Sequence, residues 1–107
     1  MVKAFDVLDD GTVANGRLFC VLKDECPGVP DGMKVDCDGN LYCTGPGGVW
    51  IIDPSGKHLG TIALGDGKRA TNLGWGGGDW KTLFITTFHE LARVRMKIPG
   101  ISVPRRI

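Results

Sequence analysis

Turn signals containing glycine or proline interrupt this 107-residue chain at short intervals, and they constrain its fold more than any other feature. Glycine accounts for 17 residues and proline for 6, so a long helix or a coiled coil is excluded. The runs between the signals are about four to eight residues long and rich in β-branched, aromatic and aliphatic side chains. This pattern predicts an all-β fold of short strands joined by tight turns. The signals are Asp10-Gly11, Asn15-Gly16, Pro30-Asp31-Gly32, Asp38-Gly39-Asn40, Gly45-Pro46-Gly47-Gly48, Pro54-Ser55-Gly56, Gly65-Asp66-Gly67 and Gly76-Gly77-Gly78-Asp79.

Two of these signals predict hairpins. Asp38-Gly39 separates two apolar runs, and this dipeptide suits the positive φ angles that primed turns require. Gly76-Gly77-Gly78 is not followed by the Lys-Ser/Thr pair of a phosphate-binding loop. A hairpin turn is therefore the simpler interpretation of the three glycines.

The segment 79–98 contains neither glycine nor proline, so its structure has to be judged from its apolar pattern. Apolar residues at helical spacing within it leave a helix as an alternative. The pair Thr86-Thr87 and a strict alternation in the last residues favour strands instead. In the predicted strand, Ala92, Val94, Met96 and Ile98 face a core, while Arg93, Arg95 and Lys97 face water.

An internal repeat of about 42 residues is visible in the apolar runs. A repeat of this length with about four strands is typical of β-propeller blades. The chain then holds about two and a half four-stranded blades: the end of one, one whole blade and most of another. The matched runs are Met33-Lys34-Val35 with Leu73-Gly74-Trp75, Leu41-Tyr42-Cys43-Thr44 with Leu83-Phe84-Ile85-Thr86, and Val49-Trp50-Ile51 with Leu91-Ala92-Arg93.

The charge balance excludes several classes of partner. Thirteen basic and 12 acidic residues give a net charge of +1, so nothing attracts nucleic acid in general. No apolar run approaches the roughly 18 residues of a membrane span. The first six residues lack the apolar core of a signal peptide. We therefore expect a cytoplasmic location if the chain is complete, and a periplasmic or other location if it is part of a longer protein.

Four cysteines occur, and none forms a pair at the C-x₂-C spacing of a zinc ribbon or redox motif. Two disulfides would be possible in a secreted chain, but nothing in the sequence indicates secretion. We expect reduced and mostly buried thiols at Cys20, Cys26, Cys37 and Cys43.

Five motifs follow one another along the chain: Pro30-Asp31-Gly32-Met33-Lys34-Val35-Asp36-Cys37-Asp38-Gly39-Asn40-Leu41-Tyr42, Gly48-Val49-Trp50-Ile51-Ile52-Asp53-Pro54-Ser55-Gly56, Leu59-Gly60-Thr61-Ile62, Thr71-Asn72-Leu73-Gly74-Trp75-Gly76-Gly77, and Lys81-Thr82-Leu83-Phe84-Ile85-Thr86. In this order and spacing they resemble the C-terminal portion of the gluconolactonase / senescence marker protein (regucalcin) / luciferin-regenerating enzyme family. The resemblance extends from about Phe5 to Gly100 and covers nearly the whole chain.

The resemblance implies a six-bladed propeller that hydrolyses sugar lactones and related esters, with residues 1–107 forming its C-terminal blades and no second domain. In the family a divalent cation at one end of the channel is held by a Glu, an Asn and the Asp of the Pro-Asp-Gly motif. By resemblance that Asp is Asp31. The cation would be calcium, with zinc, magnesium and manganese as alternatives. It would polarise the lactone carbonyl, and Asp31 would also help to activate water as a base.

Asp31 and Asn72 are the candidate site residues. From the residues alone, Asp31 is an ordinary turn residue between Pro30 and Gly32; the resemblance places it at the mouth of the channel instead. Asn72 begins the corresponding strand one blade later and would line the channel near the substrate. Its alternative role is to cap a turn or to bind a neighbouring strand.

The histidines, the tryptophans and the basic residues near the C-terminus are interpreted as structural rather than functional residues. His58 and His89 have no partner at metal-ligand spacing. The three tryptophans Trp50, Trp75 and Trp80 are expected to pack between blades rather than to stack on sugars. The basic residues near the C-terminus, with no interleaved aromatic residue, are expected to form a solvated face; they are Arg93, Arg95, Lys97, Arg105 and Arg106.

The family's Glu and Asn ligands lie upstream of the region that corresponds to Phe5, so this chain by itself lacks a complete site. We therefore expect a segment of a metal-dependent lactonase-type hydrolase that is inactive alone. Two alternatives stay open: a non-catalytic propeller segment that assembles through exposed blade edges with itself or with other blades, and a truncated product without a function of its own.

Overall fold

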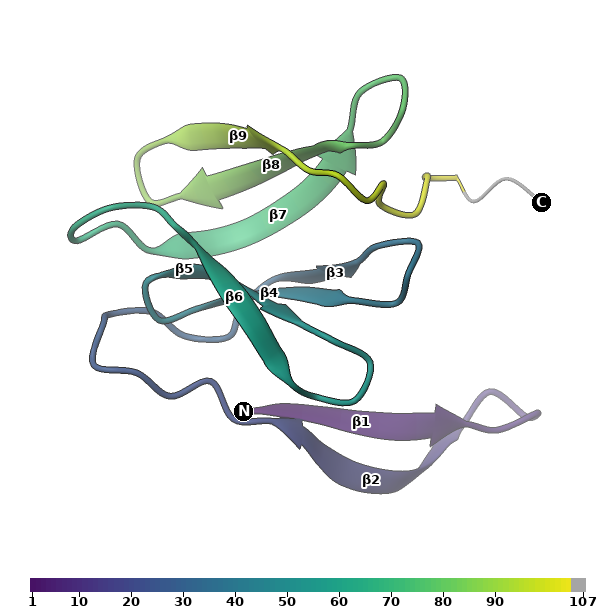
Figure 1. Cartoon of the computed structure of the whole chain (residues 1–107). Coiled ribbons are helices and arrows are strands. Elements are labelled where there is room, and N and C mark those ends of the chain that lie inside the picture. Colours follow the sequence, from purple (N-terminus) through teal and green to yellow (C-terminus); the bar gives the residue numbers. More distant parts are fainter. Residues whose placement is uncertain (105–107) are drawn as a thin grey trace.

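Residues 1–104 are described by a computed structural model, and within them the chain forms antiparallel sheets and no helix (Figure 1). Residues 1–104 therefore contain no helix that is long and apolar enough to cross a membrane. The sheets are β1-β2, β3-β4-β5-β6 and β7-β8-β9 in spatial order. The strands are β1 (Val2–Val7), β2 (Val13–Cys20), β3 (Met33–Val35), β4 (Leu41–Gly45), β5 (Gly48–Ile52), β6 (His58–Ala63), β7 (Ala70–Gly76), β8 (Thr82–Thr87) and β9 (Leu91–Arg95).

The all-β prediction is confirmed, and the helical alternative for 79–98 is wrong. Strands β8 and β9 occupy this segment and pair with each other. Along β9, Ala92 and Val94 are partly buried and the two arginines are exposed, as the alternation predicted, whereas Leu91 at the start of the strand is exposed. Arg105 and Arg106 of the predicted basic face lie outside the described residues.

Strand pairing confirms the internal repeat residue by residue. Met33 on β3 lies opposite Cys43 on β4, and Leu73 on β7 lies opposite Ile85 on β8. These are the pairs that the aligned runs predict. The three sheets have two, four and three strands. The count of about two and a half blades stays a prediction. The closed six-bladed ring stays a prediction.

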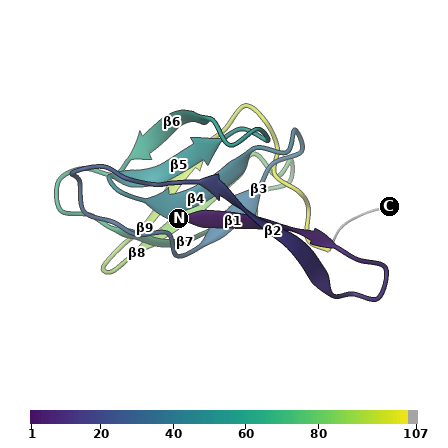
Figure 2. The ribbon, with the colours of Figure 1, turned by 90° about the horizontal axis from the view of Figure 1, so that it is seen from below.

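The three sheets lie face to face, with one apolar cluster in each interface. Figure 2 shows the β1-β2 hairpin in front of the larger sheet when the molecule is seen from below. Cys43 and Trp50 of the central sheet face the β1-β2 side, whereas Tyr42 and Val49 face the β7-β8-β9 side. Successive residues of a strand point to opposite faces, so β4 and β5 are buried on both sides because each of their faces packs against another sheet.

The hairpin predicted at Asp38-Gly39 is confirmed by the pairing of β3 with β4, although its turn is not the primed turn expected, and the turn predicted at Asn15-Gly16 is wrong. The β3-β4 connection is longer than a two-residue turn: the Asp36 amide donates to the Asn40 carbonyl at 3.0 Å, and only Gly39 has a positive φ, of 83°. Asn15-Gly16 makes no turn. It lies within β2 opposite a break in the β1 register, and Asn15 has a φ of 56°. This geometry is that of a β-bulge, which needs the same left-handed conformation as a turn.

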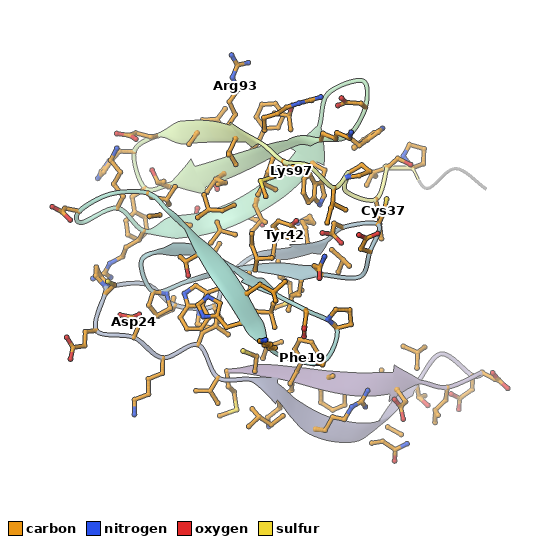
Figure 3. The ribbon with its side chains drawn as sticks, viewed as in Figure 1. Phe19, Asp24, Cys37, Tyr42, Arg93 and Lys97 are labelled. Carbon is orange, nitrogen blue, oxygen red and sulfur yellow. The ribbon has the colours of Figure 1, made fainter. Side chains whose placement is uncertain are left out.

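The C-terminal segment after β9 crosses the end of the central sheet where β3 turns into β4. The amide of Cys37 donates to the Pro99 carbonyl at 2.9 Å, and Asp36 forms a bridge with Gly100. Gly100 lies directly on the Trp75 indole, where a Cβ would overlap the ring. Figure 3 places Cys37 at this end and Asp24, in the β2-β3 loop, at the opposite end of the sheet.

Candidate functional site at the start of two inner strands

Asp31 lies just before β3, and its side chain is exposed. Its backbone is held by hydrogen bonds to Thr44 on the neighbouring strand β4. The Thr44 hydroxyl accepts hydrogen bonds from the amides of Asp31 at 2.9 Å and Gly32 at 3.2 Å. The same hydroxyl donates to the Val29 carbonyl at 3.2 Å. Asp31 therefore presents its carboxyl group to solvent from a backbone that the sheet fixes.

Asn72 lies beside this segment, on β7 of the next sheet. A Cβ on Gly32 would come within 2.7 Å of the Asn72 Cα, so the two backbones touch because residue 32 is glycine. The Asn72 side-chain oxygen accepts from its neighbour's amide, that of Leu73, at 2.8 Å. The structure therefore brings the two predicted site residues to one place, although their roles stay predictions.

Strands β3 and β7 run in the same direction from this end. Further along, the indole N–H of Trp75 on β7 donates to the Val35 carbonyl on β3 at 3.1 Å. The contact between Gly32 and Asn72 and this hydrogen bond together fix how the two innermost strands sit side by side. In Figure 1 both strands begin on the left, where the β2-β3 and β6-β7 loops also lie.

The repeat makes Thr86 on β8 the counterpart of Thr44 on β4. Its hydroxyl shares a 2.9 Å hydrogen bond with the Thr71 hydroxyl and donates to the Asn72 carbonyl at 3.3 Å. A threonine hydroxyl thus lies beneath the start of the innermost strand in both sheets. Sequence analysis did not single out either threonine, although their recurrence in the aligned runs was a usable signal.

The residues around Asp31 do not by themselves fit a cation. Carboxylate and amide oxygens have the right chemistry, but calcium takes about six to eight oxygen ligands. Within residues 1–104, no three His, Cys, Asp or Glu side chains come together in a group that could hold a metal ion. Asp31 and Asn72 could contribute to such a site, and they could not complete it.

A cleft of about 340 Å³ opens at the same end of the molecule, between the β2-β3 loop and the β6-β7 loop. Asp24, Cys26 and Asp66 are among its lining residues, and neither Asp31 nor Asn72 is. The nearby Asp24 carboxyl raises the pKa of the Cys26 thiol by charge repulsion. Lys68 lines this cleft together with the two aspartates, and the cleft lies outside the Asp31 site.

The aromatic and histidine residues mostly pack, as expected. Trp50 is buried, and its ring stacks on His58 with a centroid distance of 3.8 Å and an interplanar angle of 8°. Trp75 meets Tyr42 edge to face at 5.0 Å. His89 is exposed in the β8-β9 turn. These contacts leave Trp50 and Trp75 as packing residues rather than a sugar platform.

The four thiols are unpaired, but the expectation that they are mostly buried holds for two of them. Cys20 and Cys43 lie in the cluster between the β1-β2 and central sheets, whereas Cys26 and Cys37 are exposed. Burial raises the pKa of Cys43 to about 11. The exposed pair lies in the loops at the two ends of the central sheet, where turn residues meet solvent.

Asp36 was also missed as a key residue, because it looks like one more acidic turn residue. It is 1% exposed, and its carboxyl group accepts hydrogen bonds from the Asn40 amide at 3.0 Å and from the Tyr42 hydroxyl at 2.9 Å. Burial and the Asp36 carboxyl raise the pKa of Tyr42 well above its usual value. The Asp36 carboxyl group thus organises the β3-β4 turn, at the end of β3 opposite Asp31.

Successive antiparallel sheets packed face to face, with the first strands of the second and third sheets side by side, define a propeller-like fold. Known proteins agree with this description. The structure superposes with a TM-score of 0.82 on the X-ray structure of a proposed gluconolactonase, covering 94% of this chain and 33% of that one at 23% identity. It superposes with a TM-score of 0.72 on a gluconolactonase from Xanthomonas campestris, covering 92% of this chain and 29% of that one at 31% identity.

Sequence comparison identifies the family. The model of the SMP-30/gluconolactonase/LRE-like region matches residues 1–89, and the chain belongs to this family. A gluconolactonase of Zymomonas mobilis is 42% identical over 73 residues, which are 68% of this chain and 20% of that protein. A regucalcin of Danio rerio is 41% identical over 92 residues, which are 81% of this chain and 30% of that protein. The chain thus spans less than a third of these relatives' length.

Proposed function

We propose that this chain is the C-terminal segment of a lactonase-type hydrolase of the gluconolactonase class, built as a six-bladed propeller. The observation that carries the proposal is the placement of Asp31 beside Asn72 at the shared end of two innermost strands. Family membership supports the same class of activity. The substrate class is a sugar lactone or a related ester.

In this proposal Asp31 acts on water and Asn72 on the substrate. The Asp31 carboxylate takes a proton from a water molecule while the water oxygen adds to the lactone carbonyl carbon. The ring C–O bond then breaks, and the proton passes to the departing alkoxide. Asn72 lines the site and orients the lactone. Asp31 would also supply one carboxylate to a divalent cation, calcium first, which would polarise the lactone carbonyl; within residues 1–104 no group of three His, Cys, Asp or Glu side chains completes such a site.

A chimera tests the proposal. This chain replaces the corresponding 29% of the Xanthomonas campestris gluconolactonase, and hydrolysis of gluconolactone is followed by proton release. We expect the chimera to hydrolyse the lactone and Asp31→Asn to lower kcat by roughly 100-fold or more, since that is the usual contribution of a general base. The 107-residue chain alone is expected to show no turnover.

The matched control is Asp38→Asn, which changes an exposed carboxyl group on the turn at the opposite end of β3. It should leave the rate unchanged. A folded chimera without activity, or equal rates for the two variants, would refute the assignment.

A second candidate is a non-catalytic segment that assembles with other blades. The β1-β2 sheet favours it, because this sheet has two strands where the central sheet has four and exposes apolar side chains such as Phe5 and Leu18. Light scattering of the chain with and without calcium tests it. A discrete oligomer is expected, and a folded monomer at all concentrations would contradict it.

A further inference from the structure

The Thr44 hydroxyl uses all of its hydrogen-bonding capacity on the segment that carries Asp31. A hydroxyl group has one donor and two acceptor positions. Here the donor binds the Val29 carbonyl, and the acceptor positions take the amides of Asp31 and Gly32. Thr44 is 0% exposed, so water does not compete for these hydrogen bonds.

The segment before β3 is otherwise irregular, and it is fixed to the central sheet at only a few points. The Gly47 amide donates to the Pro27 carbonyl at 3.1 Å. Gly28 lies against Gly45, whose carbonyl carbon would be 2.7 Å from an added Cβ. Beyond these contacts the approach to Asp31 depends on the Thr44 hydroxyl and on the hydrogen bond from the Thr44 amide to the Gly32 carbonyl, at 3.0 Å.

The next sheet shows that this arrangement is particular to Asp31. Thr86 occupies the equivalent position, but its hydroxyl meets the side chain of Thr71 and the carbonyl of Asn72. It takes no backbone amide of the strand start. A threonine hydroxyl that accepts from two backbone amides is therefore found at the start of β3, next to Asp31, and not at the start of β7.

We propose that Thr44 is a positioning residue that holds the Asp31 backbone so that its carboxyl group is fixed at the mouth of the site. This inference rests on the proposed function of Asp31. Thr44 does not touch the substrate; it acts through the amides of Asp31 and Gly32. Losing the hydroxyl frees the segment, and displacement of a reacting group by about 1 Å can lower a rate by roughly 100-fold.

Three substitutions separate positioning from folding. Thr44→Val keeps the shape and removes the hydroxyl, whereas Thr44→Ser keeps the hydroxyl. The matched control is Thr87→Val in the β8-β9 turn. The Thr87 hydroxyl also accepts from two amides, those of His89 at 3.3 Å and Glu90 at 2.9 Å, and donates to the Glu90 carbonyl. It holds no proposed site residue.

The first measurement is amide hydrogen exchange by NMR on the 107-residue chain, which needs no activity. We expect Thr44→Val to speed exchange at Asp31 and Gly32 by tenfold or more relative to other β3 and β4 amides, and Thr44→Ser to restore protection. Unchanged exchange at both amides would overturn the inference.

The second measurement is gluconolactone hydrolysis by the chimera. Thr44→Val should lower kcat by roughly 10- to 100-fold with little change in KM, Thr44→Ser should recover the rate to within about threefold, and Thr87→Val should match the parent chimera. Equal losses in Thr44→Val and Thr87→Val, or no loss in Thr44→Val, would refute positioning. An inactive parent chimera would refute the proposed function instead, and the exchange experiment would still decide whether Thr44 holds the segment.

Discussion

Replacing Asp36 by alanine should destabilise the fold far more than its place in an acidic turn suggests. The Asp36 side chain is 1% exposed and accepts hydrogen bonds from the Asp38 amide at 2.9 Å, the Asn40 amide at 3.0 Å and the Tyr42 hydroxyl at 2.9 Å. Tyr42 is itself 2% exposed, so its hydroxyl would lose its partner without gaining water. Such an unsatisfied buried donor costs about 1–3 kcal/mol.

The loss of the amide hydrogen bonds adds to this cost, and we expect a total of about 2–4 kcal/mol. With a urea dependence of roughly 1–2 kcal/mol per molar, the unfolding midpoint should fall by roughly 1–4 M. Circular dichroism in urea measures it. The matched control is Asp53→Ala in the β5-β6 turn.

Asp53 makes the same backbone hydrogen bonds in its turn as Asp36 does, but it has no buried hydroxyl partner like Tyr42. Its carboxyl accepts from the Ser55 amide at 2.9 Å and the Lys57 amide at 3.0 Å, and its carbonyl accepts from the Gly56 amide at 2.9 Å. These hydrogen bonds are exposed, so water replaces the lost acceptor and the midpoint should move much less. Equal shifts for the two variants would show that burial of the Asp36 network is not what stabilises this end of the sheet.

Three further results are expected. Gly100→Ala should lower the unfolding midpoint and shift tryptophan emission to longer wavelength, because an added Cβ overlaps the Trp75 ring; Gly78→Ala, with open space around it, should do neither. Iodoacetamide at pH 8 should label Cys26 and Cys37 in the native chain, and Cys20 and Cys43 only in urea. The reason is that Cys20 and Cys43 are buried and that the pKa of Cys43 is raised to about 11. Mass spectrometry of the peptides measures the labelling, and equal labelling of all four cysteines in the native chain would contradict the prediction. The hydrogen bond from Arg95 lowers the pKa of the Asp79 carboxyl to about 2. The stability that this exposed pair contributes is therefore present above about pH 4 and is lost as the pH falls through 2. NMR titration of the Asp79 carboxyl should show that midpoint, and Arg95→Leu should raise it; an unmoved midpoint would rule out Arg95 as the cause.

Much of the fold could be predicted because its signals are local. The aligned runs 41–44 and 83–86 pair with their neighbouring strands in equivalent registers, which agrees with the repeat. Asn15-Gly16 shows the limit of such signals. A dipeptide that tolerates a positive φ serves a turn and a bulge equally well, and only the pairing of β2 with β1 decides between them.

The candidate site was predicted in part. Asp31 and Asn72 were singled out, and the structure brings them together through Gly32. Thr44 was not singled out, because a threonine in a strand looks like any β-branched residue. Its role depends on a loop that begins after β2 and returns over β4, and no local pattern records that path.

The sequence by itself determined the β class, most of the turns and the period of the repeat, because alternation and turn chemistry act over a few neighbouring residues. Only the tertiary structure decided which of these strands and loops lie side by side. The hydroxyl of Thr44 meets Asp31 across 13 residues of chain, Trp75 meets Val35 across 40, and Cys37 meets Gly100 across 63. Such contacts arise when segments distant in the sequence pack against one another, since burial brings together groups that no local rule relates.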